Sequence, residues 1–161
     1  MITIVERDLT PTETLLKDAG FAAYGAEHGD PPPAAVKPCI VAVDGTTFAG
    51  YAAGRSSNSR RWFYLSDLYV EAAYRAQGLG RRLLEAIEGV AIDLGAQKIW
   101  VWTAEYQAPG FYQKYGYTVF AEMDGWYANG RARIGLWKAL PAPVIYDSSS
   151  SSSSGTVDGG S

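Results

Sequence analysis

The sequence predicts an α/β fold, and three observations support this prediction. The runs CIVAVDGTTFAGYAAG and WFYLSDLYV are rich in apolar, β-branched and aromatic residues, which is typical of strands. Apolar residues recur with helical spacing between Gly78 and Leu94. Asp44-Gly45 lies between two apolar runs and is a strong short-range signal for a hairpin. The chain of 161 residues has the length of one domain.

A strand and a helix are the first elements expected. Apolar and polar residues alternate from Ile2 to Val5, which predicts a strand. A helix should open at Thr10-Pro11, because Thr10 or Thr12 can cap it and proline suits a first helical position. Its apolar stripe comprises Leu15, Leu16, Ala19 and Ala22 or Ala23. The segment GAEHGDPPPAAVKP is punctuated by Gly and Pro, so we expect a loop or a broken helix.

The remaining elements follow in order. After the hairpin and the strand WFYLSDLYV comes the amphipathic helix, and Gly95 should end it. The run KIWVWT predicts the next strand, followed by a short helix around PGFYQKYG that Gly116 ends. Two strands, YTVFAEM and ARIGLWKAL, complete the chain and connect near Asn129-Gly130. The predicted order is β-α-(α)-β-β-β-α-β-α-β-β.

Composition divides the chain and limits its partners. We expect one domain over residues 1–141 and a flexible Ser/Gly-rich tail of cloning origin over residues 142–161. A net charge of −3 without a basic stripe argues against nucleic acid and anionic membranes as partners. The start of the chain shows no apolar leader, so a cytoplasmic location is expected. A homodimer remains an open alternative.

Cysteine and histidine are scarce. Cys39 is the only cysteine and His28 the only histidine, which argues against a disulfide framework and a zinc site. We expect no metal. Because Cys39 falls within a predicted strand, we expect it to be a small buried apolar residue. His28 is expected to be an exposed loop residue.

The segment YRAQGLGRRLLEAIE allows three interpretations. A dinucleotide-binding fingerprint needs a third glycine where Leu83 stands, and a Walker loop needs Gly-Lys-Ser/Thr. The third interpretation is an R-x-x-G-x-G turn formed by Arg75, Gly78 and Gly80 between a strand and a helix. Free amides at a helix start, the helix dipole and nearby arginines would suit a diphosphate. The alternative is a glycine turn that only caps a core helix.

Two motifs resemble those of the GNAT acetyltransferase superfamily. LYVEAAYRAQGLGRRLLEAIE is similar to the coenzyme A motif of that family, and APGFYQKYGYTVF is similar to its next motif. The resemblance extends from about Ile2 to Leu140. It implies a mixed, mostly antiparallel sheet with helices on both faces, and acetyl-CoA as the donor substrate. In the family, the strand before the turn splays from its neighbour.

The resemblance also implies which residues bind coenzyme A. The backbone of the splayed strand should pair with the pantetheine arm through Leu68, Tyr69 and Val70. Diphosphate contacts, mainly through backbone amides, map to Arg75, Ala76, Gln77, Gly78, Leu79, Gly80 and Arg81. Many members have Asn seven residues before the motif tyrosine, where this sequence has Glu105. Gln107 is the remaining candidate for a coenzyme A contact in that segment.

Catalytic candidates follow from the chemistry of acetyl transfer to an amine. Tyr112 corresponds to the family tyrosine near the coenzyme A sulfur and could protonate the departing thiolate. Asp67 lies within an apolar run, where an unpaired charge would be costly, and is the first candidate for the base. Glu105 is the second, and Glu122, Asp124 or an ordered water are alternatives.

The acceptor is expected to be a primary amine of a small cationic molecule, such as a polyamine, an amino-sugar antibiotic or an amino acid derivative. Aromatic residues with carboxylates could hold its ammonium group, and the candidates are Tyr24, Trp126 and Tyr127. Two alternatives remain open. One is a non-catalytic protein that binds acyl-CoA or a drug, and the other is a protein or peptide N-acetyltransferase.

Overall fold

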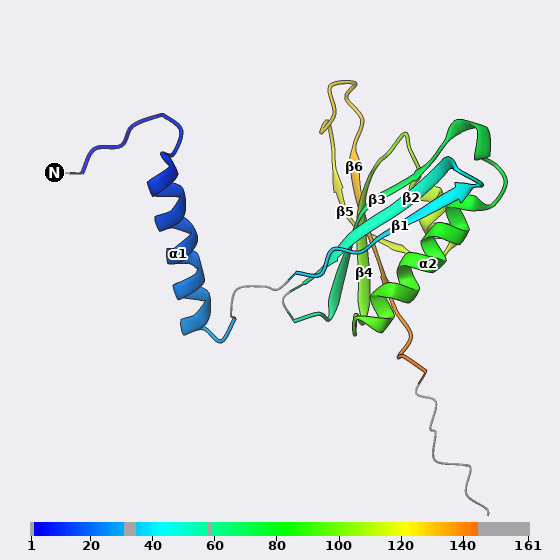
Figure 1. The fold of residues 1–161 in the computed structure, drawn as a ribbon. Helices are drawn as coiled ribbons and strands as arrows, with labels where there is room; N and C mark the ends of the chain where they lie inside the picture. The colour runs from blue at the N-terminus through cyan, green and yellow to red at the C-terminus, as the bar shows by residue number, and fades with distance from the viewer. Residues whose placement is uncertain (1, 31–34, 58, 145–161) are drawn as a thin grey trace, which may run out of the picture.

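A six-stranded sheet forms the centre of the protein. The computed structural model describes residues 2–30, 35–57 and 59–144, and the sheet order is β1-β2-β3-β4-β6-β5 (Figure 1). The strands are β1 (Cys39–Asp44), β2 (Thr47–Ser56), β3 (Trp62–Val70), β4 (Lys98–Ala104), β5 (Thr118–Met123) and β6 (Arg133–Ala139). Neighbouring strands are antiparallel except β3 and β4, which are parallel. The expected mixed, mostly antiparallel sheet is confirmed.

In the described part of the chain, four helices accompany the sheet. They are α1 (Pro11–Glu27), the 3-10 helix η1 (Ala72–Tyr74), α2 (Leu79–Asp93) and α3 (Pro109–Lys114). The amphipathic pattern of α2 buries Leu83, Leu84, Ile87 and Ala91. These side chains form one core with strand residues such as Phe63, Ile99 and Leu136, and with Tyr112 of α3. Each large side chain that is fully buried contributes roughly 1.5–3 kcal/mol, so this core fixes α2 and α3 on one face of the sheet.

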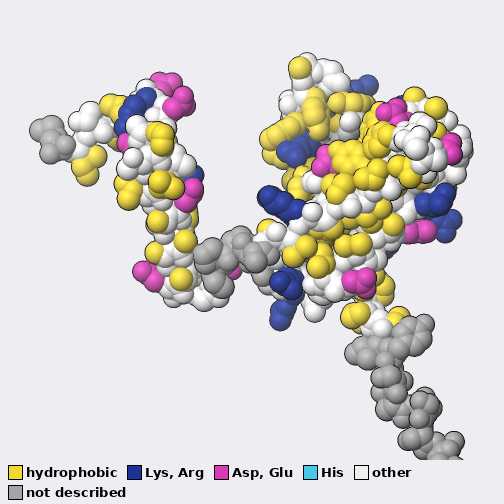
Figure 2. Space-filling view, in the orientation of Figure 1, with side chains coloured by type: hydrophobic (Ala, Val, Ile, Leu, Met, Phe, Trp, Pro, Cys, Tyr) yellow, Lys and Arg dark blue, Asp and Glu magenta, His cyan; other side chains and the backbone are white. Residues whose placement is uncertain are grey.

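Helix α1 begins as the sequence predicts but does not cover the second face. Thr10 caps it, and the Thr10 and Glu13 side chains form a reciprocal capping box. No α1 residue is buried, and Leu15 is 71% exposed. Figure 1 shows α1 standing apart from the sheet, and Figure 2 shows apolar side chains exposed along it. The expectation of helices on both faces is therefore met on one face only.

Two further predictions for the first half of the chain are wrong. Residues Ile2 to Val5 do not form a strand, and Ile4 is 96% exposed. A strand needs a neighbour for its backbone hydrogen bonds, and this segment has none within the described part of the chain. Cys39 is exposed, because β1 is an edge strand and Cys39 opens it. Of the tail predicted over residues 142–161, residues 145–161 lie outside the described part of the chain.

A bulge in β3 reverses the pattern of side chains along that strand. In the ladder with β2, Ala53 faces Asp67 but Gly54 faces Leu65, so Ser66 is an extra residue in β3. Leu65 is fully buried, and after the bulge Leu68 and Val70 pack against the core. Asp67 and Tyr69 alternate with them and therefore point to the face opposite α2.

The parallel strands β3 and β4 separate after four residue pairs. Their ladder runs from Trp62–Lys98 to Leu65–Val101, while β4 stays paired with β6 as far as Ala104. Residues 67–70 consequently remain paired with β2 on one side only. The splaying that the family resemblance implies is present, and it opens the sheet where the turn before α2 begins.

Candidate active site

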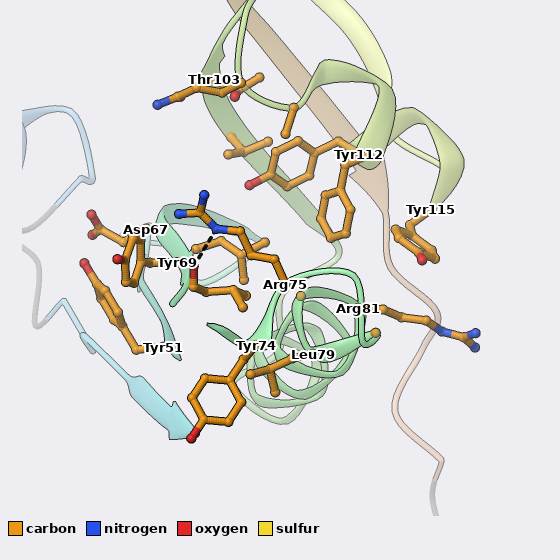
Figure 3. Close-up of a pocket in the computed structure, with 18 of the residues that line it drawn as sticks. Tyr51, Asp67, Tyr69, Tyr74, Arg75, Leu79, Arg81, Thr103, Tyr112 and Tyr115 are labelled. Carbon is orange, nitrogen blue, oxygen red and sulfur yellow. Dashed lines mark hydrogen bonds between the residues drawn. The ribbon is translucent and has the colours of Figure 1, made fainter. Parts of the chain in front are cut away.

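A cleft of about 1040 Å³ occupies the opening between β3 and β4. Its lining comes from β3, the turn before α2, the end of β4 and α3 (Figure 3). Most of the predicted site residues contribute to this lining: Asp67, Leu68, Tyr69, Val70, Arg75, Ala76, Gly78, Leu79, Gly80, Arg81, Gln107 and Tyr112. Gln77 does not line the cleft, because its side chain turns back and donates to the Ala73 carbonyl at 3.1 Å.

The turn before α2 presents a series of free backbone N–H groups. Ala76 has φ of 59° and Gly78, the N-cap, has φ of 76°, so two residues of the turn are left-handed. Among the described residues, no acceptor receives a hydrogen bond from the backbone N–H groups of residues 76–81. Gly78 supplies no side chain that could cap the helix. Adjacent free amides at a helix start form an anion-binding concavity.

Gly80 lies in the first turn of α2, where an added Cβ would make ordinary van der Waals contacts. A Cβ added there would meet the Phe111 ring at 3.5 Å and the Val70 side chain at 3.8 Å. The backbone of α2 thus lies directly against α3 and the end of β3. The absence of a side chain leaves the cleft open beside the free amides.

The two arginines of the turn differ in their surroundings. Arg75 donates from Nε to the backbone carbonyl of Val70 at 3.1 Å, and its guanidinium lies within the cleft (Figure 3). Arg81 pairs with Glu85 at 2.7 Å and points away from the centre of the cleft (Figure 3). Arg75 is therefore the arginine side chain placed to meet an anion, whereas Arg81 offers mainly its backbone N–H.

Tyr112 is a buried residue whose hydroxyl faces the cleft. The side chain is 5% exposed, and burial raises the pKa of the phenol to about 12. Its hydroxyl makes no hydrogen bond with any of the described residues. Because every fully buried polar side-chain atom among these residues has a partner, the Tyr112 hydroxyl is not fully buried. The hydroxyl is thus open to the cleft, as Figure 3 shows. At neutral pH it is a protonated donor.

Tyr117, which is buried and hydrogen-bonded, packs against the Tyr112 ring. The rings of Tyr112 and Tyr117 lie 5.4 Å apart in an edge arrangement. The Tyr117 hydroxyl donates to Glu88 at 2.9 Å, and Lys138 contacts the same carboxylate at 3.0 Å. Burial, followed by the Glu88 charge, raises the pKa of Tyr117 well above its ordinary value. These contacts link α2, β5 and β6 behind the Tyr112 ring.

Asp67 lines the cleft, but it is not the buried charge that the sequence predicts. The bulge at Ser66 turns Asp67 away from the core, so its carboxylate is exposed. Ser66 donates to it at 2.7 Å. Tyr51 stands beside it, and burial followed by the Asp67 charge raises the pKa of the Tyr51 phenol. Asp67 is therefore a solvated carboxylate on one wall of the cleft.

Glu105 is held by the backbone of the neighbouring segment. Its carboxylate accepts a hydrogen bond from the Ala132 N–H at 3.1 Å and lies 3.6 Å from Arg131. Glu105 is not part of the cleft lining. Its observed contacts fasten the end of β4 to the segment that precedes β6.

The predicted acceptor residues fall into two groups. Tyr24 lies on α1, where it packs against His28 at 4.4 Å, and does not reach the cleft. His28 ends α1 and is exposed, as expected. Tyr127 contacts Tyr106, a lining residue, at 5.6 Å. Trp126 is connected to the lining less directly, through Arg133 and Trp102.

Sequence reasoning missed several aromatic residues of the lining, among them Tyr51, Trp102 and Tyr106. Tyr51 is the ladder partner of Tyr69, so a correct register for the hairpin and β3 would have identified it. Trp102 alternates with the buried Val101 along β4, which indicates its direction. No pattern in the sequence singles out Tyr106.

Comparison with known proteins identifies the family. Residues 4–117 match the acetyltransferase (GNAT) family, and the chain belongs to this family. An acetyltransferase from Bacillus cereus has the same fold: the TM-score is 0.73 at 21% identity, covering 85% of this chain and 98% of the other.

Two characterised relatives are similar over part of the chain. Thialysine N-ε-acetyltransferase from Bos taurus is 28% identical over 92 residues, which is 56% of this chain and 51% of that protein. Blasticidin-S acetyltransferase from Streptomyces morookaense is 39% identical over 67 residues, which is 39% of this chain and 47% of that protein. The matched region thus spans about half the length of each relative.

Residues 2–30, 35–57 and 59–144 contain neither a candidate metal site nor a candidate membrane span. No group of three His, Cys, Asp or Glu residues in these ranges could hold a metal ion. None of the helices there is long and apolar enough to cross a membrane.

Proposed function

We propose that the protein is an N-acetyltransferase that moves an acetyl group from acetyl-CoA to a primary amine of a small molecule. One observation carries the proposal: free backbone amides for an anion and the open hydroxyl of Tyr112 line the same cleft. Membership of the GNAT family supports the same conclusion. The relatives described above are named for the acetylation of thialysine and blasticidin S, which are small amines.

The residues of the cleft fit acetyl-CoA as the donor substrate. The free amides of residues 76–81 and the guanidinium of Arg75 would bind its diphosphate. The edge of β3 that has left β4 offers the backbone of Leu68, Tyr69 and Val70 to the amide-containing arm. Gln107 lines the same cleft, although its side-chain oxygen already accepts from the Ala104 N–H at 3.3 Å.

Tyr112 would assist the departure of the thiolate. When the amine nitrogen attacks the thioester carbonyl, a C–N bond forms, the C–S bond breaks, and sulfur takes the electron pair. A phenol with a pKa of about 12 stays protonated throughout the physiological range and can donate a hydrogen bond to the developing charge. A thiol of ordinary pKa near 8.5 is the stronger acid, so stabilisation by this hydrogen bond is the larger part of the role.

Asp67 is the carboxylate best placed to receive the proton of the attacking amine, directly or through water. It lines the cleft, whereas Glu105 is engaged by Ala132 and Arg131. Because Asp67 is solvated, an ammonium group could also lie beside it before the proton is lost. Asp67→Asn should lower the rate at neutral pH and recover part of it at higher pH, and Glu105→Gln should have the smaller effect.

Release of free thiol from acetyl-CoA across a panel of primary amines tests the proposal. The panel includes polyamines, aminoglycosides, diamino acids and a lysine-containing peptide. Thiol release that depends on a small amine is the expected result. Release with the peptide alone would indicate a protein N-acetyltransferase. Binding of acetyl-CoA without release under any condition would indicate a binding protein and contradict the proposal.

A further inference from the structure

We infer that Arg133 binds a carboxylate of the acceptor, so that the preferred substrate carries both a primary amine and a carboxylate. This inference rests on the proposed function and adds the substrate class to it. The starting observation is the position of the Arg133 guanidinium, which lies 4.8 Å from the Trp102 ring centre and 5.0 Å from that of Trp126.

Arg133 has no acidic partner among residues 2–30, 35–57 and 59–144. Its guanidinium makes no hydrogen bond or ion pair with any of the described residues. Its cation–π contacts are with the rings of Trp102 and Trp126. Nearby Arg131, by comparison, lies 3.6 Å from Glu105. Stacking on aromatic rings uses the faces of a guanidinium and leaves the N–H groups at its edge free for a carboxylate.

The sheet places Arg133 beside the cleft. Arg133 opens β6 opposite Ala104, and its guanidinium lies on the ring of Trp102, which is part of the cleft wall. Trp102 alternates with the buried Val101, so it belongs to the face opposite α2. The cation thereby lies against the wall residue Trp102 on this face, on the side of β4 and β6, while Arg133 itself is not among the lining residues.

The opposite wall carries the complementary charge. Asp67, with Tyr51 beside it, lies on β3 and points to the same face of the sheet. This face of the sheet therefore has a carboxylate on the β3 side of the cleft and a guanidinium on the β4–β6 side, against the wall residue Trp102. A molecule with an ammonium group and a carboxylate matches both walls, whereas a simple polyamine would place a cation against Arg133.

Matched pairs of acceptors test this inference. Each pair consists of a diamino acid and the diamine that lacks its carboxylate: 2,4-diaminobutyrate and 1,3-diaminopropane, ornithine and putrescine, lysine and cadaverine. For the pair whose length fits the site, we expect the wild-type enzyme to have a kcat/KM at least about 10-fold higher for the diamino acid. Arg133→Gln should raise the KM for the diamino acid by about 10- to 100-fold and change kcat less than twofold. The kcat/KM for the diamine should not fall, because Arg133 offers a second ammonium group no favourable contact.

Arg55→Gln is the matched control. Arg55 also stacks on an aromatic ring of the sheet, Tyr64 at 5.5 Å, but Tyr64, unlike Trp102, does not line this cleft. Arg55→Gln should keep the wild-type preference for the diamino acid over the diamine, and Arg133→Lys should keep part of this preference. Equal wild-type rates within every pair, or an equal loss for both members in Arg133→Gln, would overturn the inference alone. Absence of thiol release with every amine would overturn the proposed function as well.

Discussion

The Nε–H group of Arg75 donates a hydrogen bond of 3.1 Å to the backbone carbonyl of Val70. Val70 is the last residue of β3, in the part of the strand that has left β4. The bond holds the guanidinium inside the cleft, one residue before the series of free amides begins. This arrangement joins a fixed cation to a concavity of N–H groups, which is what a diphosphate requires.

Replacing Arg75 should therefore weaken binding of the donor more than it slows the chemical step. We expect Arg75→Ala to raise the KM for acetyl-CoA about 10-fold with kcat within twofold, because a charge-assisted hydrogen bond is lost. Steady-state kinetics at saturating amine measure both constants. Arg82→Ala, in the first turn of α2 and outside the cleft lining, is the control. An unchanged KM in Arg75→Ala would remove Arg75 from donor binding.

Alanine substitutions at two glycines of the α2 region should change the free energy of unfolding in opposite directions. Gly78 has φ of 76°, so Gly78→Ala should lower the free energy of unfolding by about 1 kcal/mol and raise the KM for acetyl-CoA. Gly89 lies inside the helix with open space around it, and Gly89→Ala should raise the free energy of unfolding by roughly 0.5–1 kcal/mol. Urea denaturation and donor kinetics of the two variants make the comparison. A wild-type KM in Gly78→Ala would contradict a role for this turn in donor binding.

Tyr112→Phe should separate catalysis from binding. The substitution keeps the ring that packs against Tyr117 and removes only the hydroxyl that faces the cleft. We expect kcat to fall about 100-fold, in the range of general acid catalysis, with the affinity for acetyl-CoA nearly unchanged. Tyr64→Phe, on the opposite face of the sheet, should have no effect. If turnover survives in Tyr112→Phe, this hydroxyl is not part of the mechanism.

Burial of Tyr112 should also make the protein sensitive to alkali. The pKa of its phenol is about 12 in the folded state and near 10 when unfolded, so its contribution is fully present below pH 10 and is lost as pH rises toward 12. Between pH 9 and 12 the wild type should lose about 2 kcal/mol more unfolding free energy than Tyr112→Phe. Urea denaturation at each pH measures this difference. Parallel curves for the two proteins would contradict the assigned pKa.

Periodicity and turn chemistry in the sequence predict most of the fold. The hairpin at Asp44-Gly45, helix α2 with its end at Gly95 and the late strands are all found in the structure. These features depend on local signals. The strand expected from Ile2 to Val5 failed because alternation shows only that a segment could pair, and a strand also needs a partner.

The part of the candidate site that one continuous segment forms could be predicted from the sequence. The part that depends on the register between paired strands could not. The turn from Arg75 to Arg81 is continuous in sequence, and its free amides follow from the glycines. The bulge at Ser66 is set by pairing with β2, and it turns Asp67 out of the core where the sequence had placed it. Arg133 meets Trp102 only through the β4–β6 ladder, so no local pattern indicates it.

The fate of a labelled acetyl group tests the central claim most directly. The protein is incubated with acetyl-CoA labelled in its acetyl group and with the amine panel, and product and free thiol are quantified by mass spectrometry. We predict that the label appears on the amine nitrogen in an amount equal to the thiol released, and that Tyr112→Phe slows both together. Thiol released without acetylated amine, or no release with any amine, would contradict the account.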